Sequence, residues 1–347
     1  MAATNKRGVF SLEKVLERQS DNHWSKIPEV FRYVNEIVTA PSFGYLVGGR
    51  RSSDNYLTKV DRIDYGNDTA TAAPKGNIVD GGNIAGAGNQ SFGYTAGHKS
   101  QCNRIDYSSD TATAVQKGTL SSARTYISAV GNTNFGYWCG GTLSKKTNID
   151  RLDYSNDTAA TTPKGPLSIP TLASAGTGNR DFGYIGGLQP GQSKTLRIDY
   201  SNDTALTTEK GALIASGYMV SAAGNTDFGY WNSGSHGTRV GRLDYANDSV
   251  NAIFRGNTAY GGVKRAGTGS GNFGYFTGGD PAPQPTTVDR VDYSNDTSIA
   301  TKGPLSIGKY YHAGISAQEN GLSTVPISAT RTESGTPSPA GTDYGYI

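Results

Sequence analysis

Most of the chain is made of short runs in which apolar and polar residues alternate. In Arg-Ile-Asp-Tyr at 104–107, alternation places Arg104 and Asp106 on one face of a strand and Ile105 and Tyr107 on the other. Gly, Asn and Asp bound these runs, as they do at turns between strands. The pattern predicts an all-β fold of short strands.

The runs belong to a repeat of about 46 residues. Phe-Gly-Tyr occurs six times, at Phe43, Phe92, Phe135, Phe182, Phe228 and Phe273. An Arg-x-Asp-Tyr run follows each, and a basic residue before Gly comes 10 or 11 residues after its Asp. We expect these pairs to form a repeated structural ring in which each Arg reaches a carboxylate or carbonyl between repeats: Arg62 and Asp64, Arg104 and Asp106, Arg151 and Asp153, Arg197 and Asp199, Arg242 and Asp244, Arg290 and Asp292.

Spacing within the repeat separates packed segments from loops. The interval from each Asp to the next Phe is 29 residues in four cases and 28 in one, whereas the interval from Phe to Asp ranges from 14 to 21. Variable length indicates a surface loop after the Phe-Gly-Tyr strand. We interpret each repeat as four short strands and the whole as a six-bladed β-propeller, in preference to a β-helix or linear solenoid.

The motif order resembles a kelch repeat. Phe-Gly-Tyr is often followed by a Gly pair, then by a variable loop, the Asp-Tyr strand and a turn to the outer strand; the pair is broken at Ala96-Gly97 and Ser233-Gly234. The sequence of the repeat more closely resembles that of repetitive virion structural proteins of marine cyanophages, whose N-terminal segment matches Val9-Phe10-Ser11-Leu12. This resemblance covers roughly residues 9–318 and implies a component of a phage virion.

The two ends of the chain depart from the repeat. We assign 1–42 to an N-terminal helical anchor segment, 43–318 to the propeller and 319–347 to an extended C-terminal arm. Residues at helical spacing define the predicted anchor, which could instead cap the propeller itself: Leu12, Val15, Leu16, Ile27, Val30 and Phe31. We expect 310–316 to supply the missing strand of the first blade, with 35–42 as the competing segment.

Composition excludes several classes of protein. The 47 Gly and 21 Tyr do not fit collagen or a disordered tract, and a net charge of +3 argues against a nucleic-acid partner. No run of 18 apolar residues predicts a membrane span, and the charged N-terminus does not resemble a secretory signal. We therefore expect synthesis in the host cytoplasm and no membrane insertion. Cys102 and Cys139 form neither a disulfide framework nor a zinc motif.

The motifs with possible chemistry have structural interpretations. The Asp-Tyr-Ser-Asn-Asp-Thr run could ligate calcium, but six copies between strands favour a turn. Gly269-x-Gly271-x-x-Gly274 fits a dinucleotide pattern without its strand and helix context. We expect no cofactor, no metal site and no catalytic residues.

The resemblance and the repeats together predict a non-enzymatic scaffold. We expect attachment to the tail or baseplate, or to the head surface, through the chain termini, with other virion structural proteins as partners. The variable loops would contact a partner or the host through Arg50, Arg51, Tyr56, His98, Trp138, Lys145, Lys146, Trp231 and His236. The alternatives are a carbohydrate-binding propeller that recognises a host surface glycan, and a propeller hydrolase or oxidase.

Overall fold

The computed structural model describes residues 42–318, except 53–54, 143–146, 189–190, 216, 236, 282 and 297–298. These residues belong to one compact unit, Thr39–Val325. The predicted anchor residues Leu12 to Phe31 and the predicted arm 319–347 lie outside the described residues.

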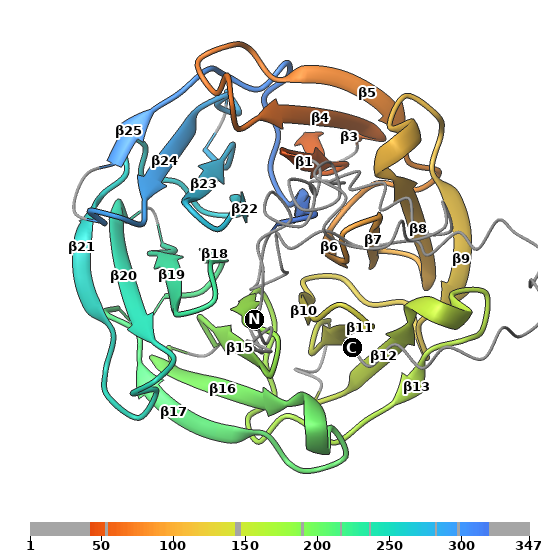
Figure 1. Cartoon of the computed structure of the whole chain (residues 1–347), viewed down its shortest axis with the longest axis vertical. Coiled ribbons are helices and arrows are strands. Elements are labelled where there is room, and N and C mark those ends of the chain that lie inside the picture. The colour runs from red at the N-terminus through yellow and green to blue at the C-terminus, as the bar shows by residue number, and fades with distance from the viewer. Residues whose placement is uncertain are drawn as a thin grey trace, which may run out of the picture. The chain divides into compact units, whose positions relative to one another are not determined.

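Six four-stranded antiparallel sheets form the blades of a ring, with β5, β9, β13, β17, β21 and β25 at its rim (Figure 1). This confirms the predicted all-β, six-bladed propeller. From the inner to the outer strand, blade 1 contains β26 (Ala313–Ser316), β1 (Phe43–Val47), β4 (Lys59–Asp64) and β5 (Ala73–Asn77). Blade 2 contains β6 (Ile84–Gly88), β7 (Phe92–Gly97), β8 (Gln101–Asp106) and β9 (Val115–Thr119). Blade 3 contains β10 (Ser128–Gly131), β11 (Phe135–Cys139), β12 (Ile149–Asp153) and β13 (Thr162–Pro163).

Blades 4 to 6 repeat this order. Blade 4 contains β14 (Ala175–Gly178), β15 (Phe182–Gly186), β16 (Lys194–Asp199) and β17 (Thr208–Ala212). Blade 5 contains β18 (Ser221–Gly224), β19 (Phe228–Asn232), β20 (Arg239–Asp244) and β21 (Ile253–Asn257). Blade 6 contains β22 (Ala266–Gly269), β23 (Phe273–Thr277), β24 (Val288–Asp292) and β25 (Ile299–Thr301). A hairpin of β2 (Arg50–Ser52) and β3 (Asn55–Tyr56) projects from blade 1. The helical turns of the described residues are η1 (Tyr107–Ser109), η2 (Tyr154–Asn156) and η3 (Tyr200–Asn202), and none of these residues form a helix long and apolar enough to cross a bilayer.

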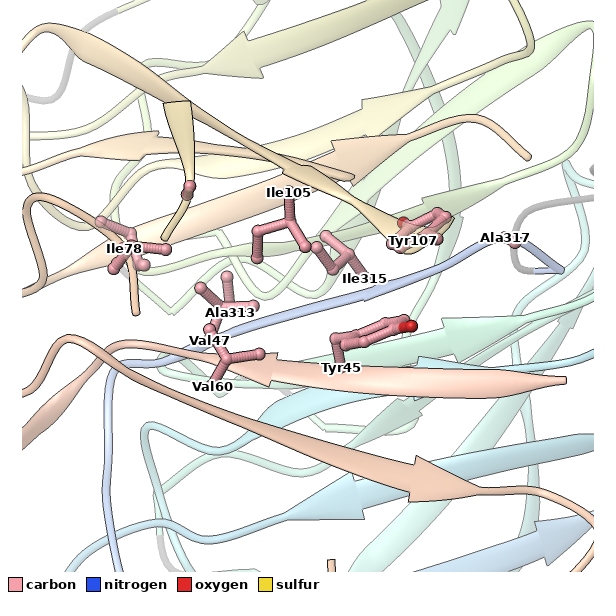
Figure 2. Packing of buried hydrophobic residues seen from close by; sticks show 11 residues of the cluster. Tyr45, Val47, Val60, Ile78, Ile105, Tyr107, Ala313, Ile315 and Ala317 are labelled. Atoms are coloured by element: carbon pink, nitrogen blue, oxygen red, sulfur yellow. The ribbon is translucent and has the colours of Figure 1, made fainter. Parts of the chain in front are cut away.

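The last described strand closes the ring. β26 pairs with β1 in antiparallel register, with Ile315 opposite Tyr45 and Ala313 opposite Val47. Figure 2 shows Ile315 between Tyr45 of blade 1 and Ile105 of blade 2, within one buried apolar cluster. The prediction that 310–316 completes the first blade is confirmed.

The inner strands meet at the centre through very small residues. The equivalent central positions are Gly86, Ala129, Gly176, Ala222, Gly267 and Gly314. A Cβ on Gly267 would lie 1.8 Å from the carbonyl oxygen of Ala222, and one on Gly314 would lie 1.8 Å from that of Gly267. Part of the glycine content therefore reflects how closely neighbouring blades approach at the axis.

The propeller has two different faces. The Phe end of each second strand pairs with the Asp end of the third, so the Asp-Tyr turns gather on one face, here named the turn face. The other end of the second strand leads into the variable loops, beside the connections between blades. We name this side the loop face.

Candidate functional site

The six predicted Arg residues all join neighbouring blades. Arg104 and Tyr94, which lie opposite each other on β8 and β7, both donate to Asp157 of the next blade at 2.8 Å. Lys117 from the outer strand lies 3.1 Å from the other oxygen of Asp157. The expectation that each Arg reaches a carboxylate between blades is confirmed.

The same inter-blade cluster of Tyr, Arg, a basic residue and Asp occurs six times around the ring. The Asp is four residues after the Asp-Tyr aspartate, and sequence reasoning did not single it out, although every repeat contains it. The six Arg–Asp pairs are Arg62–Asp110, Arg104–Asp157, Arg151–Asp203, Arg197–Asp248, Arg242–Asp296 and Arg290–Asp68. The last pair joins blade 6 to blade 1, so the ring of clusters is closed.

Electrostatics keep the cluster around Asp157 in one protonation state. Burial and the hydrogen bond to Asp157 raise the pKa of the Tyr94 hydroxyl well above its ordinary value. Burial alone would raise the pKa of the Asp157 carboxyl, but hydrogen bonds from Tyr94, Lys117 and Arg104 outweigh it and lower that pKa. A neutral Tyr donor and an ionised Asp acceptor are suited to packing rather than to proton transfer at neutral pH.

The aspartate of each Arg-x-Asp pair has a local role. Asp106 accepts hydrogen bonds from the backbone N–H of Ser108 at 2.9 Å and from its hydroxyl at 2.6 Å. Asp153 and Asp199 cap the turns at Ser155 and Ser201 in the same way. These contacts support the interpretation of the Asp-Tyr-Ser-Asn-Asp-Thr run as a turn.

Tyrosines also stack across the blade boundaries. The Tyr of each Phe-Gly-Tyr lies against an Asp-Tyr tyrosine of the next blade, with ring centroids 4.6 to 5.2 Å apart, as in Tyr94–Tyr154. Twelve of the 21 tyrosines take part in these stacks. The tyrosine-rich composition is thus largely a feature of blade packing.

Three fully buried ion pairs break the six-fold pattern. Arg124–Asp150, Arg265–Asp289 and Lys309–Asp61 lie in blades 3, 6 and 1, with N–O distances of 2.7, 2.8 and 3.0 Å. Each cation also donates to a backbone carbonyl of the second strand. Sequence reasoning missed these pairs because the cations lie in connections that do not repeat.

Two of the predicted contact residues are not on the surface. Trp138 and Trp231 lie in strands β11 and β19 and are 0% and 2% exposed. Their indole N–H groups donate to the carbonyl oxygens of Ala85 and Ala175 in the preceding blades. Their prediction as loop contacts is wrong, because the apolar ring fills the space beside the glycines of Phe-Gly-Tyr.

The other described contact residues lie together on the loop face. Arg50, Arg51 and Tyr56 belong to the β2–β3 hairpin, and the half-buried His98 lies in the loop after β7. The ring of His98 stacks on Tyr56 at 4.5 Å, and the Arg50 guanidinium donates to the Tyr56 hydroxyl at 2.7 Å. Tyr56 is 39% exposed, so this group offers an aromatic surface to solvent. Lys145, Lys146 and His236 lie outside the described residues.

The mouth of the central channel opens on this face and has an unusual backbone. Tyr126, Ala173, Met219, Lys264 and Tyr311 occupy equivalent positions before the inner strands, and all have φ between 53° and 62°. Four hydrogen bonds join them in a chain around the axis, because the N–H groups of Ala173, Met219, Lys264 and Tyr311 each donate to the carbonyl of the equivalent residue in the preceding blade. Left-handed backbone in non-glycine residues costs roughly 1–3 kcal/mol each, so the surrounding ring must hold these residues in place.

Asn83 occupies the sixth position and interrupts this chain of bonds. Among the residues that the structure describes, its backbone joins no such bond and neither atom of its side-chain amide has a hydrogen-bond partner. The residue is only 3% exposed and lines a cavity of about 100 Å³ at the axis. Ser221 lines the same cavity, is 3% exposed, and its hydroxyl is also without a partner in the described part of the chain.

The remaining candidates for chemistry carry no site. Cys102 and Cys139 are buried free thiols, and burial raises the pKa of Cys102 to about 12. The described residues contain no group of three or more His, Cys, Asp or Glu placed to hold a metal ion. The loop-face mouth is therefore the candidate functional site.

Comparison with known proteins does not extend this assignment. Neither the models of protein families nor the curated proteins contain a match to the chain.

Proposed function

We propose that this chain is a non-enzymatic structural protein of a phage particle, in which the propeller is a rigid scaffold. The observation that carries the proposal is the six-fold inter-blade cluster, which devotes the repeated charges of the chain to holding the blades together. A scaffold of this kind keeps its variable loops in fixed positions. The amino-acid sequence of the repeats, which resembles that of repetitive phage virion proteins, supports the assignment to a virion.

We also infer that the repeat is a divergent kelch repeat. The Gly pairs at Gly48-Gly49, Gly140-Gly141 and Gly278-Gly279 all have positive φ at the end of the second strand. That conformation favours glycine and explains why the pair marks the start of the variable loop. The Gly pair is broken in the other two repeats, at Ala96-Gly97 and Ser233-Gly234.

In this proposal the termini attach the propeller to tail or baseplate proteins, with the head surface as the alternative position. Other virion structural proteins are the partners of the termini, and the loop face remains available for a further partner or the host. The compact unit Thr39–Val325 would supply the scaffold.

Deletion of residues 1–38 from the phage-encoded chain tests the proposal. We expect the truncated protein to keep a β-rich circular dichroism spectrum, because the propeller lies within Thr39–Val325. We expect its amount in purified particles, measured by quantitative mass spectrometry against the major capsid protein, to fall at least ten-fold. Normal incorporation of the truncated chain would show that the N-terminal segment is not the anchor, and absence of the full chain from particles would contradict the virion role.

A further inference from the structure

We propose that the outer edge of β21 in blade 5 binds an extended segment of another protein, one that carries a carboxylate next to two apolar residues. This strand lies on the rim of the ring rather than at the channel mouth (Figure 1). The site goes beyond the scaffold role and does not depend on a place in a particle. None of its residues is among the contacts predicted from the sequence.

The first observation is that β21 lacks the protection of the other outer strands. The outer strand of a sheet can pair with a further chain, and proteins prevent this with Pro, charged side chains or very short strands. The residue before the basic residue is Phe254 in blade 5, whereas the other five blades have Pro74, Gln116, Pro163, Glu209 and Thr301. Phe254 is 46% exposed and the adjacent Ile253 is 47% exposed. β21 therefore presents two neighbouring apolar side chains to solvent.

The second observation concerns the side of β21 that faces blade 6. Ile253 lies opposite Arg242 on β20, and Arg242 and Arg255 both reach Asp296 of blade 6. Both arginines use the same oxygen, Oδ2, whereas the Lys that replaces Arg255 in each other blade lies beside Oδ1 of its Asp. One carboxylate thus faces two guanidinium groups, which leaves an excess of positive charge beside Ile253.

The opposite side of β21 also combines an apolar residue with an arginine. Phe254 lies opposite Gly241, and a Cβ on Gly241 would lie 2.9 Å from the side chain of Ile214, which follows β17 of blade 4. The Arg239 guanidinium lies 5.2 Å from the centroid of the Phe254 ring. Arg239 is exposed, and within the described part of the chain it forms no ion pair or hydrogen bond. Each side of the strand therefore carries one apolar and one cationic group.

The third observation is a missing backbone bond at Gly256. In the other blades the Gly after the basic residue donates its N–H to the carbonyl of the next blade's cluster aspartate at 2.7 to 2.9 Å, as at Gly76, Gly118, Gly165, Gly211 and Gly303. Gly256 has a φ of 149°, the one positive value among the six, and among the described residues it makes no such bond. The run from Asp292 to Lys302 in blade 6 is one residue shorter than in the other repeats. The edge of β21 is thus not tied to its neighbour as the other outer strands are.

These side chains define the chemistry of the segment. A strand added to a sheet edge places successive side chains on alternate sides, so two adjacent apolar residues can cover Ile253 and Phe254 together. A carboxylate beside them can pair with the guanidinium of Arg239 or Arg255, whose planar donors match it. A basic segment would bring like charges together. The edge therefore favours an acidic and apolar segment.

A flexible segment fits this edge better than a second copy of the ring. β21 has five residues and lies on the convex rim (Figure 1), whereas a stable interface uses about 20–30 residues on each side. Pairing of two copies would also bring the arginines of both edges together. An extended segment can follow the strand and contact both of its sides.

Fluorescence anisotropy with the purified full chain tests the site. The probe is the dye-labelled peptide Thr-Thr-Glu-Val-Ile-Thr-Asp, and the control peptide has Lys in place of Glu and Asp. We expect the acidic probe to bind roughly ten-fold more tightly than the control peptide. Phe254→Gln and Arg239→Gln, which introduce the residues of blade 2, should each weaken its binding roughly ten-fold. Val115→Thr, at the position of Ile253 on the outer strand of blade 2, is the matched control and should bind as the wild type does.

Stability and self-association separate the outcomes. Both Gln variants should keep the melting temperature of the wild type, because blade 2 folds with Gln at these positions; if one variant is destabilised, the other decides. No binding of the acidic probe, equal binding of the two peptides, or full affinity in a stable Gln variant would each overturn the proposal. A dimer in sedimentation velocity that Phe254→Gln dissociates would show that a second copy covers β21, and would overturn it too. Since these measurements use the purified protein, their failure leaves the virion role untouched.

Discussion

At the scale of single residues, one aspartate in each repeat gathers contacts from three side chains of the preceding blade. Asp157 accepts hydrogen bonds from Tyr94 and Arg104 and lies beside Lys117, with only 8% of its side chain exposed. Removing its charge would leave two cations facing each other in a poorly hydrated space. The contribution of this residue comes less from the attraction itself than from the penalty of breaking the cluster.

Asp157→Asn should therefore lower the free energy of unfolding by about 3 kcal/mol, at the lower end of the range for buried pairs because Arg104 and Lys117 are partly exposed. Urea denaturation followed by circular dichroism measures this change. Asp153→Asn is the matched control, since Asp153 in the same turn caps Ser155 locally and its loss should cost about 1 kcal/mol or less. Equal losses for the two variants would contradict the assignment of the inter-blade role to Asp157.

His312 makes the ring closure sensitive to acid. It is buried beside β26, its Nε2 lies 2.8 Å from the Thr277 hydroxyl, and burial together with the nearby cations Lys309 and Arg265 lowers its pKa well below the ordinary value. The carboxylates Asp61 and Asp289 are engaged by those same cations. The folded protein therefore keeps His312 neutral.

The sign of the pH effect follows from this depressed pKa. Below about pH 6.5 the unfolded chain protonates His312 while the folded chain does not, so stability falls as the pH falls from 7 to 5, by at most about 1.4 kcal/mol per pH unit. Urea midpoints across this range should show the slope in the wild type and a smaller slope in His312→Gln. An identical slope in both proteins would exclude His312 as its source.

At the scale of elements, the inner strands are limited by how closely they approach. Gly267→Ala would place a Cβ 1.8 Å from the Ala222 carbonyl oxygen, which is a backbone atom and cannot turn aside as the end of a flexible side chain can. We expect a loss of about 1–3 kcal/mol in urea denaturation, as for overpacked cores. Gly271→Ala, in the same repeat, meets nothing within 4 Å and should change stability by less than about 0.5 kcal/mol. Similar effects for the two variants would contradict the close-approach argument.

The elements also show what the sequence could predict. Fixed spacing from each Asp to the next Phe identified the strands and the closing segment, because packed strands tolerate no insertion. The sequence predicts that each Arg reaches a carboxylate or a carbonyl, but it does not identify the residue. Six nearly equal repeats do not say which Asp faces which Arg. Trp138 and Trp231 were misplaced because a residue that stands out from a repeat can be a packing solution as well as a contact.

The channel mouth could not be predicted for a different reason. Its positions hold Asn83, Tyr126, Ala173, Met219, Lys264 and Tyr311, which share no side-chain property. The common feature is the left-handed backbone of five of them, and it is imposed by the hydrogen-bonded ring rather than by local preference. Tertiary constraint of this kind leaves no mark on a single sequence.

At the scale of the whole molecule, the two faces of the propeller have different roles. Repeated charges and tyrosines on the turn-face side join the blades, whereas the loop face carries the residues that differ between blades. In the proposed function the rigid ring is part of a particle and presents its loop face outward or to another subunit. Rigidity and variation are thus assigned to opposite sides of one ring.

The central claim of the proposed function is that this chain is part of a phage particle, and cryo-electron microscopy of intact particles tests it most directly. We predict six-bladed rings of about 46 residues per blade bound to the tail or baseplate, or to the head, with density from the chain termini against a neighbouring subunit and the channel mouth uncovered or in contact with a second partner. Particles that contain no such ring, although the host cell makes the protein, would contradict the account.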